Sequence, residues 1–199
     1  MTGFILAGGQ SSRIGRDKAL LPVGSQLLIE LVIERIQPLV ERVVVIGNPR
    51  NVQPLKARLT HNTHRILTDL APACGPLMGI YTGLMQTDTA VNLFVPCDMP
   101  WVDSRLVERL ARRCRAGAEV VASLHPCEGV QPFPLICDAK ACRTIRALLT
   151  AGDYSLQALL RQPNASLIRI EEPALWRSFT NINTIADYAK LSNYTTVAR

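Results

Sequence analysis

A short apolar run near the start of the chain, residues 4–6, is followed at once by a loop with glycines at positions 8, 9 and 15. Such a run predicts a buried strand, and the glycines predict a sharp turn after it. Because glycine lets the backbone come close to a ligand, the amide N–H groups of this loop can face an anion. The chain is therefore expected to adopt an α/β fold with an anion site at the end of its first strand.

Two positively charged side chains, Arg13 and Lys18, lie on the same loop. Neither common phosphate-binding pattern is present in the sequence, because Lys18 precedes Ala19 where a Walker loop has Ser or Thr, and the three-glycine spacing of dinucleotide-binding loops is missing. The glycines alone could serve only to shape a tight turn. Together with the two cations, they predict a polyphosphate site of another type.

The order of residues 6–18 resembles the signature loop of the MobA-like NTP transferases, the nucleotidyltransferases that make dinucleotide forms of the molybdenum cofactor. In that family Leu-Ala-Gly-Gly is followed by a short polar spacer, Arg, an apolar residue, Gly and Asp-Lys. This chain has the same pattern from Leu6 to Lys18, with Ile14 where the family usually has Met. The resemblance implies the nucleotidyltransferase fold.

The chain has 199 residues, of which 48% are hydrophobic and 19% charged. This length predicts one globular domain over residues 1–199. We expect residues 1–100 to form mainly the nucleotide-binding half, residues 101–192 mainly the half for the second substrate, and residues 193–199 a tail. No apolar run is long enough to span a bilayer and the start shows no export signal, so we expect a cytoplasmic protein without membrane contact.

The net charge of +6 suits anionic substrates, although it would suit nucleic acid or plain solubility equally. The densest basic cluster, residues 105–115, contains an apolar stripe and predicts an amphipathic helix with a solvated basic face. Aromatic residues make up 5% of the chain and are not interleaved with basic ones, which argues against a nucleic-acid partner. The six cysteines lack the spacing of a zinc site, and we expect reduced thiols.

The remaining patterns predict strands and helices in alternation. Strands are expected at residues 43–46, 65–67, 91–95, 119–123, 130–137 and 166–171, and helices at residues 26–36, 105–115, 140–150, 155–161 and 185–191. A strand, a helix and a strand in succession favour parallel pairing. We therefore predict a single-domain α/β fold with a mostly parallel, Rossmann-like sheet flanked by helices.

Ligands of such sheets gather at the carboxyl ends of the strands. Asn48 follows the second strand and could contact a nucleotide, although Asn before Pro is equally typical of a turn. After the third strand, Gly75 and Gly79 lie one helical turn apart, which suits either close packing or a close ligand. Asp69 followed by Gly-Pro-Leu-x-Gly resembles the second signature of the family, although the intervening Ala-Cys departs from the usual spacer.

Asp98 follows the fourth strand and lies between Pro96 and Pro100. A carboxylate at this position suits a hard cation such as Mg²⁺. It could otherwise cap a helix, but Asp103 and Ser104 already suit that role. The sequence Pro-Cys-Asp-x-Pro resembles the metal-binding motif of the guanylyl-transferring members.

Three residues of the second half are candidates for contact with the second substrate. Asn181 and Asn183 would point to one side of an extended segment, and Asn-x-Asn-Thr before a terminal helix recurs in the family. Without the resemblance, these residues would equally suit a helix cap. Gln131 is a weaker candidate, because it rests only on the region of the family in which it lies. His125 is interpreted as an ordinary loop histidine.

The resemblance implies transfer of GMP from GTP to the terminal phosphate of a molybdopterin-type cofactor, with release of pyrophosphate. It assigns catalysis to Arg13, Lys18 and Asp98, and Mg²⁺ to Asp98. Nucleotide contacts are expected from Leu6, Ala7, Gly8, Gly9, Lys18, Asn48, Asp69, Gly75, Gly79 and Asp98. A cytidylyltransferase or a sugar-phosphate nucleotidyltransferase would share the fold, and a non-catalytic nucleotide-binding carrier is the alternative of another class. Transient contacts with cofactor-delivery proteins and recipient molybdoenzymes belong to the same expectation.

Overall fold

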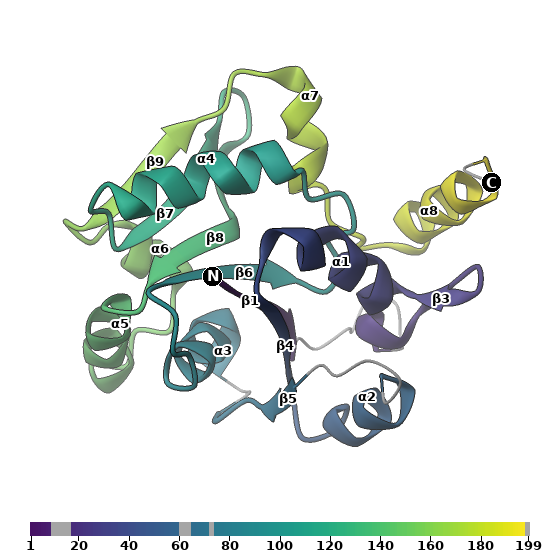
Figure 1. Ribbon diagram of the computed structural model, residues 1–199, viewed down its shortest axis with the longest axis horizontal. Coiled ribbons are helices and arrows are strands. Elements are labelled where there is room, and N and C mark those ends of the chain that lie inside the picture. Colours follow the sequence, from purple (N-terminus) through teal and green to yellow (C-terminus); the bar gives the residue numbers. More distant parts are fainter. Residues whose placement is uncertain (9–16, 60–64, 72–73, 198–199) are drawn as a thin grey trace.

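A seven-stranded sheet forms the centre of the protein, in the strand order β5-β4-β1-β6-β8-β7-β9. The structure is a computed structural model and describes residues 1–8, 17–59, 65–71 and 74–197. In Figure 1 the sheet runs from β9 at the top to β5 at the bottom. The strands are β1 (Thr2–Ala7), β4 (Arg42–Gly47), β5 (Arg65–Thr68), β6 (Val91–Pro96), β7 (Val120–His125), β8 (Gly129–Asp138) and β9 (Ala165–Arg169).

Strand β1 lies between β4 and β6 and pairs with both in parallel, while β5 extends the parallel half beyond β4. The register pairs Ala7 with Gly47 and Leu6 with Pro96, so these strands end at one edge of the sheet. Strand β8 runs antiparallel to both β6 and β7, and β9 is parallel to β7 at the outer edge. The predicted α/β fold with a mostly parallel sheet is confirmed, with β8 as its antiparallel member.

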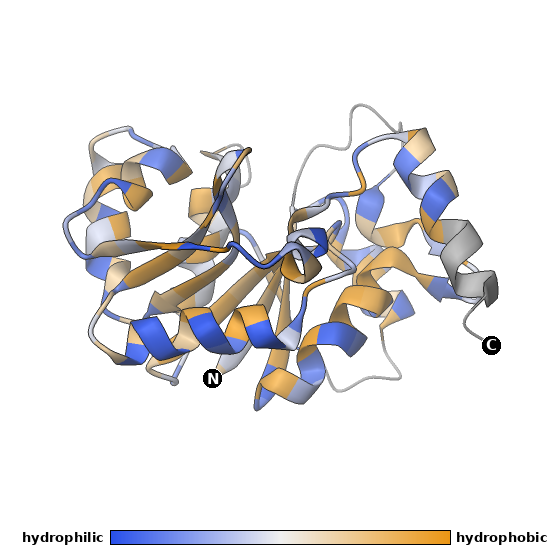
Figure 2. Cartoon of the chain, turned by 90° about the horizontal axis from the view of Figure 1, so that it is seen from above, coloured by the Kyte–Doolittle hydropathy of each residue, from blue (hydrophilic) through white to orange (hydrophobic). Residues whose placement is uncertain are grey.

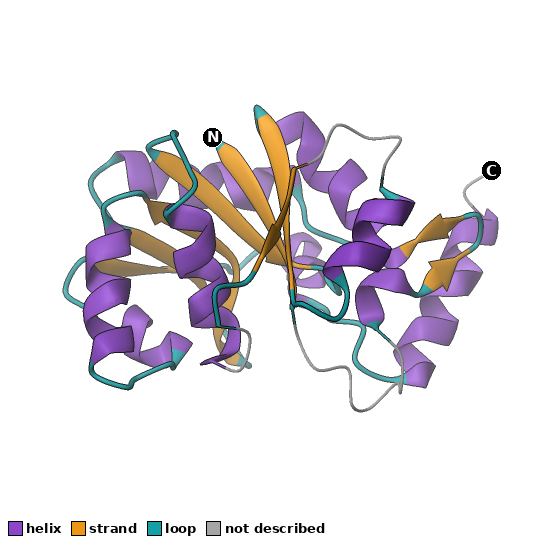
Figure 3. Ribbon diagram, turned by 90° about the horizontal axis from the view of Figure 1, so that it is seen from below, coloured by secondary structure: helices purple, strands orange, loops and turns teal. Residues whose placement is uncertain are grey.

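Helices cover both faces of the sheet, and the strands between them are largely hydrophobic (Figures 2 and 3). One face packs against α1 (Leu28–Ile36), α2 (Val52–Arg58), α4 (Ser104–Arg115) and α7 (Pro173–Trp176). The other packs against α3 (Gly75–Leu84), α5 (Ala141–Thr150) and α6 (Leu156–Leu160). Helix α4 buries its apolar stripe and leaves its arginines toward solvent, as its sequence predicts.

Several short elements differ from the sequence prediction. The helix expected from residue 26 begins at Leu28, because β3 (Gln26–Leu27) first forms a hairpin with β2 (Pro22–Val23). The last helix, α8 (Ile185–Val197), continues into the expected tail, where the sequence contains no Gly or Pro to stop it. Among the helices of the described ranges, none has the length and apolar character needed to cross a lipid bilayer.

His125 lies at the end of β7 and is buried, which corrects its interpretation as a loop residue. Its ring packs against Trp176 and Phe179, with centroid distances of 4.5 Å and 6.1 Å. Its Nδ1 accepts hydrogen bonds from the backbone N–H groups of Cys127 and Glu128. The side chain therefore closes the turn between β7 and β8 and has a structural role.

Gly83 lets α3 approach the sheet where the rings of Phe4 and Phe94 stack at 4.9 Å. A Cβ atom on Gly83 would lie 2.8 Å from Phe94 Cε1 and 3.0 Å from Phe4 Cδ1. We expect Gly83→Ala to lower the free energy of unfolding by ~1–2 kcal/mol, because overpacking of ~1–3 kcal/mol exceeds the gain in helix propensity. Urea unfolding measures this effect.

The matched control for this prediction is Gly79→Ala in the same helix. There the nearest atom to the added Cβ would be Leu6 Cδ2 at 3.0 Å, the end of a flexible side chain that can move. Gly79→Ala should therefore destabilise the protein less than Gly83→Ala. An equal or larger loss at Gly79 would contradict the packing argument.

Candidate active site

Backbone hydrogen bonds join the carboxyl end of β6 to that of β1, and the carboxyl end of β5 to that of β4. Cys97 N–H, just after β6, donates to Leu6 O at 3.0 Å, and Asp69 N–H, just after β5, donates to Gly47 O at 2.8 Å. These bonds extend the sheet by one residue past its regular strands. They place the loops that follow the four parallel strands at one edge.

Five of the predicted nucleotide-binding residues meet at this edge. Asn48 Nδ2 donates to Gly8 O at 3.2 Å. Cβ atoms added to Gly8 and Gly79 would lie 3.7 Å and 3.8 Å from the same oxygen, Asp69 Oδ2. Leu6 Cδ2 would lie 3.0 Å from the added Cβ on Gly79. The two glycines therefore keep space open around Asp69, Asn48 and the end of β1.

Asp69 is buried in this space, with 8% of its surface exposed. Burial raises the pKa of its carboxyl, while hydrogen bonds from Ala71 N–H and the Thr82 hydroxyl lower it in part. A buried carboxylate with few partners is costly for folding, which is typical of a residue kept for binding.

The raised pKa of Asp69 predicts a pH-dependent stability. Because the pKa in the folded protein lies above the ordinary 3.8, the stability that this carboxyl contributes is present below about pH 3.8 and is lost as pH rises through the folded-state value. Asp69→Asn removes this titration. Urea unfolding should show the variant gaining stability relative to the wild type from about pH 4 to about pH 7. Parallel pH profiles for the two proteins would contradict it.

A second group of predicted residues meets around the ammonium of Lys18. Its Nζ donates to Asp98 Oδ2 at 2.7 Å and to Asn183 Oδ1 at 2.6 Å. The Lys18 and Asp98 side chains are 17% and 14% exposed, so the ion pair is partly shielded from water. Lys18 opens the short 3-10 helix η1 (Lys18–Leu20), and Asp17 caps it by accepting a hydrogen bond from Ala19 N–H at 3.0 Å.

The segment that carries Asn183 is fixed on both sides. Ile182 N–H donates to Asp98 O at 2.9 Å, so the chain before α8 runs directly beside the loop after β6. The backbone N–H groups of Asn183 and Thr184 both donate to Asp187 Oδ2, at 3.1 Å and 2.9 Å. Asn183 is therefore held in position by its own backbone.

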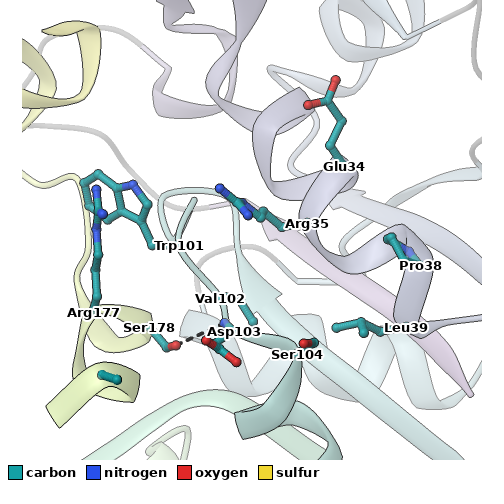
Figure 4. Close-up of a pocket in the computed structure, with 11 residues that line it drawn as sticks. Glu34, Arg35, Pro38, Leu39, Trp101, Val102, Asp103, Ser104, Arg177 and Ser178 are labelled. Carbon is teal, nitrogen blue, oxygen red and sulfur yellow. Dashed lines mark hydrogen bonds between the residues drawn. The ribbon is translucent and has the colours of Figure 1, made fainter. Parts of the chain in front are cut away.

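Contacts further upstream dock this segment on the loop that follows Asp98. The Arg177 guanidinium lies over the Trp101 ring, 4.6 Å from its centroid, and Ser178 Oγ accepts a hydrogen bond from Asp103 N–H at 3.0 Å. Figure 4 shows these contacts at one end of a 440 Å³ groove, which Arg35 and its neighbours on α1 border on the opposite side. The stack and the hydrogen bond join 3-10 helix η4 (Arg177–Phe179) to the start of α4.

Asp98 and Asn183 offer two hard oxygens around one ammonium, a donor set that fits Mg²⁺ shared with substrate phosphates and water. In the described ranges, no cluster of three or more His, Cys, Asp or Glu side chains is placed to hold a metal without a substrate. The neighbouring Cys97 is buried, and burial raises the pKa of its thiol well above the ordinary range. All six cysteines lie in the described ranges and are free thiols, as predicted.

The model of the MobA-like NTP transferase domain matches residues 3–167 of this sequence. The chain belongs to the MobA-like NTP transferase family. The molybdenum cofactor guanylyltransferase of Vibrio parahaemolyticus is 32% identical over 187 residues, which covers 94% of this chain and 92% of that protein.

Solved structures share the fold of this chain. The molybdopterin-guanine dinucleotide biosynthesis protein A of Archaeoglobus fulgidus superposes with a TM-score of 0.82 at 21% identity, covering 98% of this chain and 99% of that one. A Mycobacterium tuberculosis protein, Rv0371c, solved in complex with manganese, has a TM-score of 0.71 at 16% identity, covering 96% and 97% of the two chains.

In this MobA-like NTP transferase, the structure shows fewer contacts between the remaining predicted residues and the rest of the site. Gly75 begins α3 with a φ of 69°, and a Cβ added to it would lie 3.9 Å from Tyr154 O, so its first role is the turn into the helix. Asn181 is exposed. Gln131, on the half of β8 toward the edge where β6 ends, donates to Glu128 Oε2 at 3.5 Å. Arg13 and Gly9 lie outside the described residues, and the functional assignments of all five of these residues stay predictions.

The sequence prediction missed Asn51, which is buried at the same edge of this MobA-like fold. Its Nδ2 donates to Ala7 O at 2.6 Å and to Asp17 Oδ2 at 2.7 Å. In the sequence, an Asn at the start of a helix is ordinarily interpreted as a cap. Its position three residues after Asn48, itself a candidate, is the one signal that could have drawn attention to it.

Proposed function

We propose that this protein transfers GMP from GTP to the terminal phosphate of a molybdopterin-type cofactor, forming the guanine dinucleotide cofactor and releasing pyrophosphate. The observation that carries the proposal is the convergence of Lys18, Asp98 and Asn183 beside the glycine-lined space at the end of β1. The relatives that match nearly the whole chain are named molybdenum cofactor guanylyltransferases. The proposed setting is the cytoplasm.

The residues present suit a transfer that needs no general base. A phosphate monoester has its second pKa near about 6 and is largely dianionic at neutral pH, so it can attack the α-phosphorus of GTP without losing a proton to the protein. The protein then has to neutralise charge and align the two phosphates. Lys18 supplies the fixed cation, and hydrogen bonds to Asp98 and Asn183 hold the ammonium in one place.

Asp98, with Asn183 beside it, would hold a divalent cation that we propose to be Mg²⁺, and this cation would neutralise charge on the phosphates. The backbone amides around Ala7 and Gly8 would face the triphosphate of GTP. Leu6, Ala7 and Gly8, with Asn48 and Asp69, would also supply the other contacts to the nucleotide. Arg13, Gly9, Gly75 and Gly79 are proposed as further nucleotide contacts or turns, with Arg13 also assisting catalysis. Gln131 and Asn181, together with Asn183, are proposed for the second substrate.

The test is pyrophosphate release by the purified protein with Mg²⁺, the metallated pterin and each nucleotide in turn, with the product identified by mass. Release with GTP and a product of the mass of the guanine dinucleotide supports the proposal. Release with CTP, or with a sugar phosphate in place of the pterin, would show that the substrates differ from those proposed, while the proposed site residues would keep their roles. Nucleotide binding without release under any pairing would favour a carrier.

A further inference from the structure

We infer that Asn51 is a positioning residue that fixes Lys18 relative to the nucleotide-binding end of β1. The inference rests on the proposed function, because it gives Asn51 a task in binding the triphosphate. Asn51 is 2% exposed and lies at the start of α2, beyond β4. It contacts three parts of the site, two of which lie 44 and 34 positions away in the sequence.

The carboxamide of Asn51 uses all of its polar atoms on these contacts. One N–H of Nδ2 donates to Ala7 O at 2.6 Å, the last residue of β1. The other donates to Asp17 Oδ2 at 2.7 Å, the residue before Lys18. Oδ1 accepts from Asn48 N–H at 2.9 Å. A single planar group therefore joins the end of β1, the loop after β4 and the start of η1.

Asp17 links Asn51 to the backbone around Lys18. Its Oδ1 accepts the hydrogen bond from Ala19 N–H at 3.0 Å, while Oδ2 is held by Asn51. The carboxylate is thus fixed at both oxygens, and the first turn of η1 is fixed with it. Since Lys18 is the next residue, its backbone position depends on this pair of hydrogen bonds.

Helix capping does not explain the side chain of Asn51. It occupies the N-cap position of α2, yet within the described part of the chain its side chain makes no capping hydrogen bond to that helix. Its oxygen goes to Asn48 and its nitrogen to Ala7 and Asp17 instead. Asn51 therefore does not make the capping hydrogen bond for which Asn is favoured at this position, and its side chain makes hydrogen bonds within the site instead.

Gly47 provides the space that this arrangement needs. A Cβ on Gly47 would lie 2.6 Å from Asn51 Oδ1 and 3.1 Å from both Leu55 Cδ1 and Val52 Cγ2. Any side chain at Gly47 would push the carboxamide out of place. The absence of a side chain at the last residue of β4 therefore makes room for the carboxamide of the residue at the N-cap of α2.

Asn92 offers a matched control, because it is another fully buried asparagine with several hydrogen bonds. Its Oδ1 accepts from the Thr87 and Thr89 hydroxyls at 2.6 Å and 2.9 Å, and its Nδ2 donates to Thr89 O at 3.1 Å. It lies near the start of β6, at the edge of the sheet opposite the site. Its loss should disturb the fold without touching nucleotide binding.

The experiment compares Asn51→Ala with Asn92→Ala by calorimetric titration with Mg²⁺ and whichever of GTP, CTP and ATP the wild type binds. Both variants should lose thermal stability. Asn51→Ala should also weaken nucleotide affinity by ~10- to 100-fold, the range seen when a group that orients a binding residue is lost. Asn92→Ala should bind like the wild type. In steady-state assays, Asn51→Ala should raise KM for the nucleotide and lower kcat, with KM for the pterin unchanged.

A double variant that exchanges the residue types at positions 51 and 17 distinguishes a positioning role of Asn51 from a general effect on stability. Asn51→Asp places two carboxylates against each other and should bind nucleotide more weakly than the wild type. Adding Asp17→Asn restores one donor and one acceptor across the pair, so the double variant should recover part of the affinity that Asn51→Asp loses. Additive losses in this cycle would overturn the inference.

The outcomes also separate this inference from the proposed function. A wild type that binds a nucleotide but releases no pyrophosphate defeats the proposed reaction, whereas the titrations still decide the role of Asn51. Equal affinity of Asn51→Ala and Asn92→Ala defeats the role of Asn51 alone. A wild type that binds no nucleoside triphosphate defeats both.

Discussion

Replacing Lys18 by alanine is expected to lower kcat for pyrophosphate release by ~10²- to 10³-fold, the usual cost of removing one fixed group that stabilises charge in the transition state. The ammonium is held at 2.7 Å from Asp98 and 2.6 Å from Asn183, so no other side chain of the described site can take over its position without rearrangement. Because the ion pair is partly shielded from water, its charge acts more strongly than that of an exposed lysine.

Two control variants make the Lys18 result specific. Lys140→Ala removes an exposed lysine at the start of α5 and should leave kcat unchanged. Lys18→Arg keeps the charge but presents a planar, longer group, so it should recover only part of the activity. Initial rates of pyrophosphate release measure all three. Activity of Lys18→Ala within about threefold of the wild type would remove Lys18 from its proposed role.

The second large effect is expected from Asp98→Asn. The substitution keeps the shape of the side chain and leaves the backbone oxygen that accepts from Ile182 N–H in place. It removes the carboxylate charge that we propose for the metal. The rate should fall on the order of 10³-fold, since a bound metal supplies several kcal/mol of charge stabilisation.

The metal dependence of the residual activity tests the Asp98 assignment directly. Half-maximal activity of Asp98→Asn should require much more Mg²⁺ or Mn²⁺ than the wild type requires. Asp103→Asn is the matched control, because Asp103 lies in the same loop but caps α4 and pairs with Arg105. It should keep the metal dependence of the wild type. An unchanged metal requirement in Asp98→Asn would show that the cation binds elsewhere.

The parallel half of the sheet follows from the sequence because its strands are apolar runs that end in clear turn signals. Val43 to Ile46 and Leu93 to Val95 are buried in β4 and β6 as that pattern predicts. The candidate residues Asn48 and Asp98 follow within two residues of the ends of these strands. The parallel topology then explains why the two lie at one edge of the sheet.

Short elements and long-range contacts were harder to predict. Helix α2 buries little more than Val52 and Leu55, too few residues to show a helical period. The hairpin of β2 and β3 has two residues in each strand. The contact of Lys18 with Asn183 spans 165 positions and depends on how the whole chain packs, so no local sequence pattern could bring the two together in advance.

The hydrogen bond from Ile182 N–H to Asp98 O also affects when the site can form as the chain is synthesised. Residues 1–8, 17–59 and 65–71 already carry most of the nucleotide end, and the family model ends at residue 167. Asn183 and Ile182, whose N–H donates to Asp98 O, are synthesised after the other residues of the described site. Because contacts between residues distant in the sequence form slowly, the contact of Lys18 with Asn183 should form after the local contacts of the nucleotide end. Catalytic competence should therefore arise in a late step of folding.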